Sequence, residues 1–322
     1  MRIYSPEVFQ GKMSNQHYFE GWYFKSVDAS ETNAFAVIPG VSLAGDKSHS
    51  FIQFLDGPNH KSYYFKYAIN DFWAAPDKFE VKIGKSYFSR FKMQLDINDQ
   101  QAKIKAQLDF KNITPWPVSL LSPGVMGWYR FVPKMECYHG VLSFNHHIDG
   151  YFEINGERKD FMAGKGYCEK DWGTSMPTSW IWMQTNHFVE KEVSLFGSIA
   201  KIPWMGGFFT GYIFGLYLKG KIYKFTTYNG SKIRRLAVDK DKIEAIVENR
   251  EYQLTISASR QAGADLAVPA FGEMNSKVNE SLKSNIEIKL VDNKTKLLIF
   301  KGTGRNAGLE FVGNVEELLK GF

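Results

Sequence analysis

The residues best suited to chemistry gather in one short stretch, 164–188, which reads GKGYCEKDWGTSMPTSWIWMQTNHF. Its ionisable side chains are Glu169, Lys170, Asp171 and His187, and they stand among tyrosine, tryptophan and phenylalanine rings. Rings favour burial, whereas a carboxylate avoids burial unless it is paired or functional. The pattern indicates a polar site walled by rings. The plainer alternative is a solvated turn followed by core tryptophans.

A strand is expected after Pro177, over 179–188, because apolar and aromatic residues dominate this run. With a period of two, one face of that strand carries Trp180, Trp182, Gln184, Asn186 and Phe188. Two indoles beside two amides suit a ligand cavity better than an ordinary core. Tyr167 and Trp172 are further candidates for the wall of this cavity.

Composition indicates a β-rich globular protein. A length of 322 residues fits two domains of about 100–200 residues each. The aromatic fraction, 16%, is high and fits both pleated strands and an apolar binding cavity. The net charge of +6 is spread along the chain, and no nucleic-acid-binding motif is present in the sequence. We therefore expect an apolar small molecule as partner, no nucleic acid, and at most peripheral contact with a membrane.

Other features bear on location and cofactors. Two cysteines fit a reducing compartment, and the first residues lack the apolar core of a signal peptide, so we expect a cytoplasmic protein. The uncharged run 202–218 approaches the length of a membrane helix, but Pro203, Gly206 and Gly207 interrupt it and favour two strands. Cys137, His139, His146 and His147 lack metal-site spacing, so neither a metal nor another cofactor is expected. The sequence does not indicate an oligomeric state.

Strand-like runs separated by turn residues fill most of the chain, which predicts an all-β fold. The segment 112–133 holds four prolines and is expected to be an ordered loop over a barrel mouth or between domains. The polar segment 261–285 is expected to be a loop. A short helix is expected over 315–320, with Asn314 as its cap, Glu317 as capping-box partner and Gly321 as its stop.

A weak internal repeat predicts the domain organisation. The run GWYFK (21–25) precedes FAVIP (35–39), and IWMQT (181–185) precedes FGSIAKIP (196–203). Both read as a strand, a turn and a strand that ends in Ile-Pro, with a tryptophan at the same place. Two antiparallel β-barrels in tandem, 1–176 and 177–322, would explain the repeat.

Four segments resemble the tocopherol cyclase family: HYFEGWYFK (17–25), MECYHGVLS (135–143), the central stretch and FTTYNG (225–230). That family is similar to two-domain lipocalin-like proteins such as carotenoid hydratases and Diels–Alderases. The resemblance implies two lipocalin-like (calycin) barrels with a pocket at or between them. The relatives' motif Asp-His-Glu-Trp corresponds here to Glu169-Lys170-Asp171-Trp172, so both acids are kept and a lysine replaces the histidine.

The resemblance also implies an enzyme of the isomerase class, an intramolecular lyase. It would protonate the tail alkene of a prenylated quinol, after which a phenolic oxygen closes onto the cation to form a chromanol ring. Asp171 or Glu169 would be the acid, with Glu20 behind them, and Lys170 or His187 would orient the acid or the quinol. Trp22, Trp172, Trp180 and Trp182 would line the cavity. Two alternatives stay open: a related hydratase or isomerase, and a non-catalytic protein that binds an apolar isoprenoid or lipid.

Overall fold

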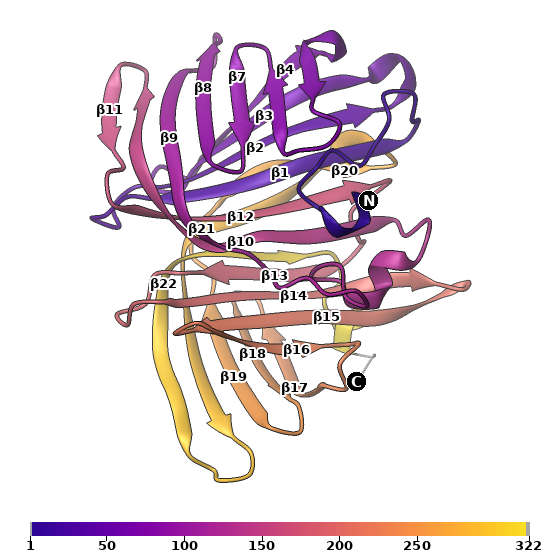
Figure 1. The fold of residues 1–322 in the computed structure, drawn as a ribbon, viewed down its shortest axis with the longest axis vertical. Helices are drawn as coiled ribbons and strands as arrows, with labels where there is room; N and C mark the ends of the chain where they lie inside the picture. The colour runs from indigo at the N-terminus through magenta and orange to yellow at the C-terminus, as the bar shows by residue number, and fades with distance from the viewer. Residues whose placement is uncertain (1, 320–322) are drawn as a thin grey trace. The chain divides into compact units, whose positions relative to one another are not determined.

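The computed structural model of the chain describes residues 2–319, and their regular secondary structure is almost entirely β-strand (Figure 1). The chain divides into two compact units. The first ends at Met176 and also includes Ala264–Val278, and the second contains Pro177–Gly263 and the chain from Asn279 onward. The expected all-β fold is confirmed. The predicted division at 176/177 did not anticipate that residues 264–278 belong with the first unit.

The first unit contains one antiparallel sheet. Its strands are β1 (Tyr18–Val27), β2 (Ala34–Leu43), β3 (His49–Asp56), β4 (Lys61–Ala68), β5 (Phe72–Ala74), β6 (Glu80–Ile83), β7 (Ser86–Ser89), β8 (Lys92–Asn98), β9 (Lys103–Thr114), β10 (Cys137–Ile154), β11 (Glu157–Asp160) and β12 (Gly164–Gly173). Short 3-10 turns lie at η1 (Arg2–Tyr4), η2 (Gly45–Lys47), η3 (Ile69–Asp71) and η4 (Gly127–Phe131). The spatial order is β4-β3-β2-β1-β12-β10-β9-β8-β7-β6-β5, with β11 paired to β10. The edge strands β4 and β5 follow each other in the chain, as expected of a sheet that curls into a barrel.

The sheet of the second unit repeats this topology. Its strands are β13 (Trp180–Thr185), β14 (Val193–Trp204), β15 (Gly207–Leu218), β16 (Lys221–Thr226), β17 (Lys232–Asp239), β18 (Lys242–Glu248), β19 (Tyr252–Ser259), β21 (Glu273–Asp292) and β22 (Leu298–Val312). β20 (Ala264–Ala270) pairs with β21, and residues 264–278, which include β20 and the start of β21, belong to the first unit. The order is β16-β15-β14-β13-β22-β21-β19-β18-β17. In both sheets the first strand pairs with the last long strand, β1 with β12 and β13 with β22. The edge strands β16 and β17 are again consecutive in the chain.

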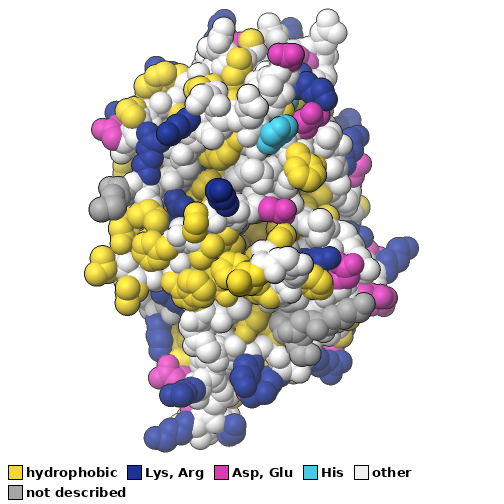
Figure 2. Space-filling view, turned by 90° about the vertical axis from the view of Figure 1, so that its right-hand side faces the viewer, with side chains coloured by type: hydrophobic (Ala, Val, Ile, Leu, Met, Phe, Trp, Pro, Cys, Tyr) yellow, Lys and Arg dark blue, Asp and Glu magenta, His cyan; other side chains and the backbone are white. Residues whose placement is uncertain are grey.

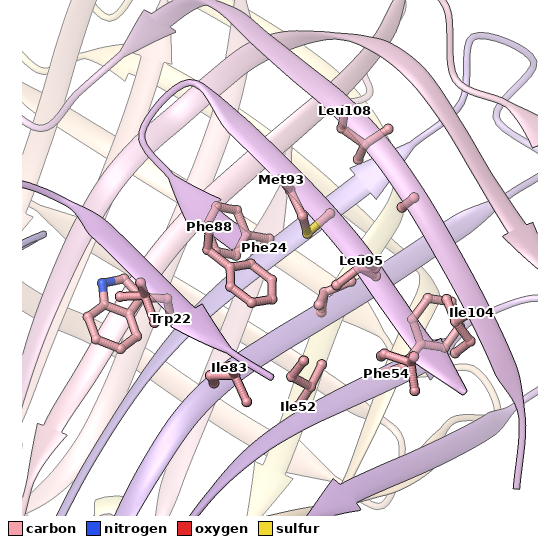
Figure 3. Packing of buried hydrophobic residues seen from close by; sticks show 14 of the residues in the cluster. Trp22, Phe24, Ile52, Phe54, Ile83, Phe88, Met93, Leu95, Ile104 and Leu108 are labelled. Carbon is pink, nitrogen blue, oxygen red and sulfur yellow. The ribbon is translucent and has the colours of Figure 1, made fainter. Parts of the chain in front are cut away.

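Alternation of apolar and polar residues explains why each sheet curls around a core. Along β8 every second residue is buried, which places Met93, Leu95 and Ile97 inside. Figure 3 shows part of the resulting core, where Trp22 and Phe24 from β1 lie with Phe88 and Met93. A separate core cluster fills the second unit, with Ile181, Met183, Phe214 and Ile256 among its members.

The prediction of a loop over 261–285 is wrong, because this segment forms β20 and the start of β21. Side chains from strands β2 and β3 hydrogen-bond to the backbone of this segment. Gln53 donates to the Ala267 carbonyl at 2.9 Å and accepts from the Ala267 N–H at 2.8 Å. Ser42 Oγ also donates to the Gly272 carbonyl at 2.5 Å. These partners lie more than 200 residues away in sequence, so local polarity misled the prediction.

Two other predictions can be compared directly. The run 202–218 forms the end of β14 and all of β15, as expected, and no helix within residues 2–319 is long and apolar enough to span a membrane. The short helix α1 (Glu316–Leu319) is capped by Asn314, whose Oδ1 accepts from the Glu316 N–H at 3.1 Å. Glu317 is not the capping-box partner, since its carboxylate accepts from Lys201 at 2.6 Å while Ser179 Oγ accepts from the cap N–H. The predicted end at Lys320 and stop at Gly321 lie outside the described residues.

Candidate functional site

Three adjacent strands of the first unit, β1, β12 and β10, carry most of the ionisable residues singled out in the sequence (Figure 1). On the central strand, β12, Asp171 lies opposite His139 of β10, and Lys170 lies opposite Trp22 of β1. Since side chains alternate along a strand, Glu169 and Asp171 share one face and Lys170 projects from the other. The second face is the inner one, because Trp22 and Cys168 belong to the core of the barrel.

On the first face, His139 lies between two carboxylates. Its Nδ1 is 2.8 Å from Asp171 Oδ1, and its Nε2 is 3.6 Å from Glu169 Oε2. The Tyr167 hydroxyl donates to the same Glu169 oxygen at 2.5 Å. The Glu169 side chain is only 6% exposed, whereas His139 and Asp171 are 16% and 24% exposed. We call these four residues, His139, Tyr167, Glu169 and Asp171, the His139 cluster.

The electrostatics of this cluster favour a charged imidazole. Burial lowers the pKa of His139, but the charges of Asp171 and Glu169 and the hydrogen bond to Asp171 outweigh it and raise the pKa to about 9. Burial, the Glu169 charge and the hydrogen bond to Glu169 raise the pKa of Tyr167 well above its usual range. At neutral pH the cluster therefore holds an imidazolium and a phenol, which are two proton donors directed at carboxylates.

The raised pKa predicts how stability depends on pH. Because the pKa of His139 rises from 6.5 to about 9 on folding, its stabilising contribution is complete below the unfolded value and is lost as pH rises through the folded value. The loss amounts to about 3 kcal/mol of unfolding free energy between roughly pH 6 and pH 10. Urea unfolding of wild type and His139→Gln over this range should show the difference. A matched change at the exposed His147 should leave the wild-type slope intact, and equal slopes for wild type and His139→Gln would contradict the prediction.

The inner face carries a second charged group, the ion pair between Lys170 and Glu20. Both side chains are fully buried. Lys170 Nζ also donates to the carbonyls of Pro6 at 2.8 Å and Val8 at 2.6 Å. Glu20 accepts from the backbone N–H groups of Gln10 and Gly11 and from the Tyr18 hydroxyl. Burial lowers the pKa of Lys170 to about 8, although the charge of Glu20 acts against this.

These contacts give Glu20 and Lys170 a structural role, which is to fasten residues 6–11 against the barrel. The sequence placed both with the catalytic group, yet they project from the face opposite Glu169 and Asp171. Trp22 and Trp172 lie with them, with ring centroids 4.7 and 4.9 Å from Lys170 Nζ. Within this unit, the expected cavity wall is therefore divided between two faces of one sheet.

The remaining predicted residues belong to the second unit. Trp180, Trp182 and Gln184 alternate along β13 with Ile181 and Met183, which lie in the core of that unit. Trp180 Nε1 donates to Glu310 Oε2 at 2.6 Å. Asn186 and His187 follow the strand and are buried, and the His187 carbonyl accepts from the Arg305 N–H at 2.9 Å. Their expected participation in the site stays a prediction.

Sequence reasoning missed His139 as a partner of the acids and considered it only as a metal ligand. It lies 32 residues from Asp171, and the two meet only through the register of β10 with β12. His139, Glu169 and Asp171 also bring three ligand atoms within 4.8 Å of one another. However, the imidazole directs its two nitrogens at different carboxylates, an arrangement that suits proton sharing. The expectation of no metal stays a prediction.

Comparison with known families places the chain. Residues 76–313 match the profile of the family described as tocopherol cyclase-like. The chain belongs to this family. Among curated relatives, the probable chloroplastic tocopherol cyclase of Oryza sativa subsp. japonica is 30% identical over 109 residues, and the chloroplastic tocopherol cyclase of Zea mays is 29% identical over 109 residues. Each match covers 33% of this chain and 23% of the relative.

Solved structures share the fold of this tocopherol cyclase-like protein at low identity. CghA with Sch210972 superposes with a TM-score of 0.57 at 9% identity, covering 92% of this chain and 89% of that one. Kievitone hydratase from Nectria haematococca superposes with a TM-score of 0.50 at 11% identity, covering 95% of this chain and 93% of that one. Likeness at this level shows a common architecture, and it confirms the lipocalin-like fold expected from the sequence.

Proposed function

We propose that this tocopherol cyclase-like protein catalyses acid-promoted ring closure of a prenylated quinol, with the His139 cluster as its proton-transfer machinery. The observation that carries the proposal is the partly buried cluster of two carboxylates, one imidazole and one phenol in the first unit. His139 is hydrogen-bonded to Asp171, Tyr167 donates to Glu169, and His139 Nε2 lies 3.6 Å from Glu169 Oε2. Ring closure needs a proton added at carbon and a proton removed from oxygen. A group of linked donors and acceptors serves both steps.

The reaction balances without an added reagent. The His139 imidazolium first passes its proton to Glu169, and Glu169 delivers it to the tail alkene, so the π bond breaks, a C–H bond forms and a tertiary cation is left. A phenolic oxygen of the quinol attacks this cation, a C–O bond forms, and the phenolic O–H gives up its proton. The imidazole of His139, neutral after its proton transfer to Glu169, takes up this proton and becomes an imidazolium again, which leaves the cluster ready for another cycle.

Each member of the cluster has a distinct role in this scheme. Glu169 is the acid because it is the more buried carboxylate, and burial favours its taking a proton from the His139 imidazolium. Tyr167 holds Glu169 in place through its hydroxyl. Asp171 fixes the orientation of His139 at Nδ1, and His139, once it has given its proton to Glu169, receives the phenolic proton. Holding the tail near the phenolic oxygen lowers the activation barrier of ring closure by about 7–11 kcal/mol in favourable cases.

The test is turnover of a prenylated quinol in heavy water. Ring closure by this mechanism incorporates one deuterium at the carbon next to the new ether carbon, which mass spectrometry of the chromanol detects. A related hydratase would instead yield a tertiary alcohol that carries oxygen from labelled water. An organic extract rich in one apolar lipid, with no turnover of any prenylated quinol, would contradict the proposal and favour the binding protein.

Exposed hydrophobic side chains suit a surface that contacts a membrane, from which an apolar substrate would enter the protein. Figure 2 shows hydrophobic side chains gathered on one face among lysines and arginines. In the first unit, the large exposed hydrophobic residues include Val118, Leu120, Leu121, Trp128 and Phe131. This segment is the proline-rich loop of the sequence, and rings beside basic residues suit a lipid interface. Peripheral membrane contact and a cytoplasmic location stay predictions.

A further inference from the structure

The inner face of the first barrel holds a cavity of about 300 Å³. Its walls are largely apolar, with Phe24, Phe79, Phe110, Trp116 and Cys168 among the lining residues. Pro115, Pro117 and Val118 also line it, so the proline-rich loop lies over this cavity, one of the two positions expected for it. Val118 and Arg90 are exposed and mark where the cavity reaches the surface.

Tyr4, Glu7, Arg90, Ser143 and His146 are the polar or ionisable side chains that line the cavity besides Cys168 and Trp116. Ser143 and His146 are buried and have no part in the proposed reaction. Ser143 Oγ donates to the Asn145 carbonyl at 3.0 Å, so it must accept from His146 Nδ1, which lies 2.9 Å away. This fixes the tautomer of the imidazole and leaves Nε2 as its acceptor nitrogen. Burial lowers the pKa of His146 to about 3, so the ring is neutral. Burial likewise raises the pKa of the Cys168 thiol, which stays protonated.

The backbone is shaped to hold this histidine. β10 changes register against β12 between Val141 and Ser143 and again between Ser143 and His146. Such bulges redirect side chains and are frequent next to functional sites. Opposite them stands Gly166, where an added Cβ would come within 2.1 Å of His146 Nε2. Only glycine leaves room for the imidazole, which accounts for one of the glycines in the stretch 164–166.

This cavity is separate from the His139 cluster. Cys168 lines the cavity, while its neighbour Glu169 belongs to the cluster, and successive side chains of a strand point to opposite faces. The sheet itself therefore stands between the two groups of residues.

We propose that the barrel of the first unit binds a second, small ligand: an uncharged, largely apolar molecule with one hydroxyl group that donates a hydrogen bond to His146. The cavity volume is at the low end of the range of about 300–1,000 Å³ for small-molecule sites, which favours a compact ring or a short chain. The neutral imidazole and the protonated thiol offer no charge to an ionised ligand in the buried part of the cavity. The charged lining residues are Arg90, which is exposed, and Glu7, which is partly buried. This inference does not depend on the reaction proposed for the His139 cluster.

Calorimetric titration with 2-naphthol and with naphthalene tests the proposal, because the two probes differ only in the hydroxyl group. Wild type should bind 2-naphthol more tightly than naphthalene. The variant His146→Phe keeps a ring of similar size. Its affinity for 2-naphthol should be about 3–10-fold lower than that of wild type, and its affinity for naphthalene should be nearly unchanged. Glu169→Gln should bind both probes as wild type does. Equal affinity of wild type and His146→Phe for 2-naphthol, or loss of binding in Glu169→Gln, would overturn the proposal.

Thiol labelling of the wild-type protein gives a second measurement that needs no variant. Cys168 lines the cavity and Cys137 does not, so bound 2-naphthol should slow alkylation of Cys168 and leave Cys137 unaffected. Peptide mass mapping distinguishes the two sites. If saturating 2-naphthol leaves the labelling rate of Cys168 unchanged, the ligand does not enter this cavity and the proposal is wrong.

Discussion

Replacing Glu169 by Gln is expected to lower kcat for ring closure by about 10²–10⁴-fold, the usual contribution of a positioned general acid. Glutamine has the same shape and can still accept from Tyr167, but it carries no transferable proton. The measurement is chromanol formation from a prenylated quinol, read together with circular dichroism and urea unfolding to show that the variant folds.

A matched control is Glu157→Gln, because that carboxylate lies on β11 and is 71% exposed. Its kcat should equal the wild-type value. Asp171→Asn should reduce kcat less than Glu169→Gln does, since Asp171 acts through His139 and not at the alkene. Full activity of Glu169→Gln would remove Glu169 from the mechanism, and a larger loss in Asp171→Asn would exchange the two roles.

Replacing Lys170 by Met is expected to cost about 3–5 kcal/mol of unfolding free energy, because it leaves the buried carboxylate of Glu20 without its cation. The loss also removes the two hydrogen bonds by which Lys170 holds the Pro6 and Val8 carbonyls. Residues 6–11 should then become accessible to proteolysis. Urea unfolding and limited digestion measure the two effects.

The control for this experiment is Lys47→Met, which breaks an ion pair of 2.9 Å with Glu273 at the surface. The side chain of Lys47 is 70% exposed, so Lys47→Met should lower the free energy of unfolding by no more than about 1 kcal/mol. If Lys170→Met lost as little as Lys47→Met, the inner ion pair would not fasten the N-terminal segment as the contacts indicate.

The internal repeat predicted the topology of the two sheets but not the face on which each side chain lies. It predicted that β1 and β13 open equivalent sheets, and their pairing with β12 and β22 agrees. It also aligned Trp22 with Trp182. Trp22 lies in the core of its unit, whereas the neighbours of Trp182, Ile181 and Met183, occupy the core of the other. The topology was therefore predictable, but a shift of one residue reverses which face a side chain occupies.

The candidate site was predictable only in part for a related reason. The sequence grouped Glu169, Lys170 and Asp171 as one motif because they are consecutive, yet alternation along β12 places Lys170 on the other face of the sheet. Period-two geometry alone would have separated them. His139 is different, because only the pairing of β10 with β12 brings it to Asp171.

The sequence by itself determined the all-β class, the tandem repeat and the family, and it supplied the two acids of the candidate site as a prediction. These features are recorded in short-range patterns, since strand alternation, turn residues and family motifs all lie within a few positions. Tertiary structure alone decided that Glu20 pairs with Lys170 inside the barrel, that His139 joins Glu169 and Asp171, and that Gly166 makes room for His146. Each of these contacts depends on the register between neighbouring strands. That register is determined by how residues far apart in the sequence pack in the core.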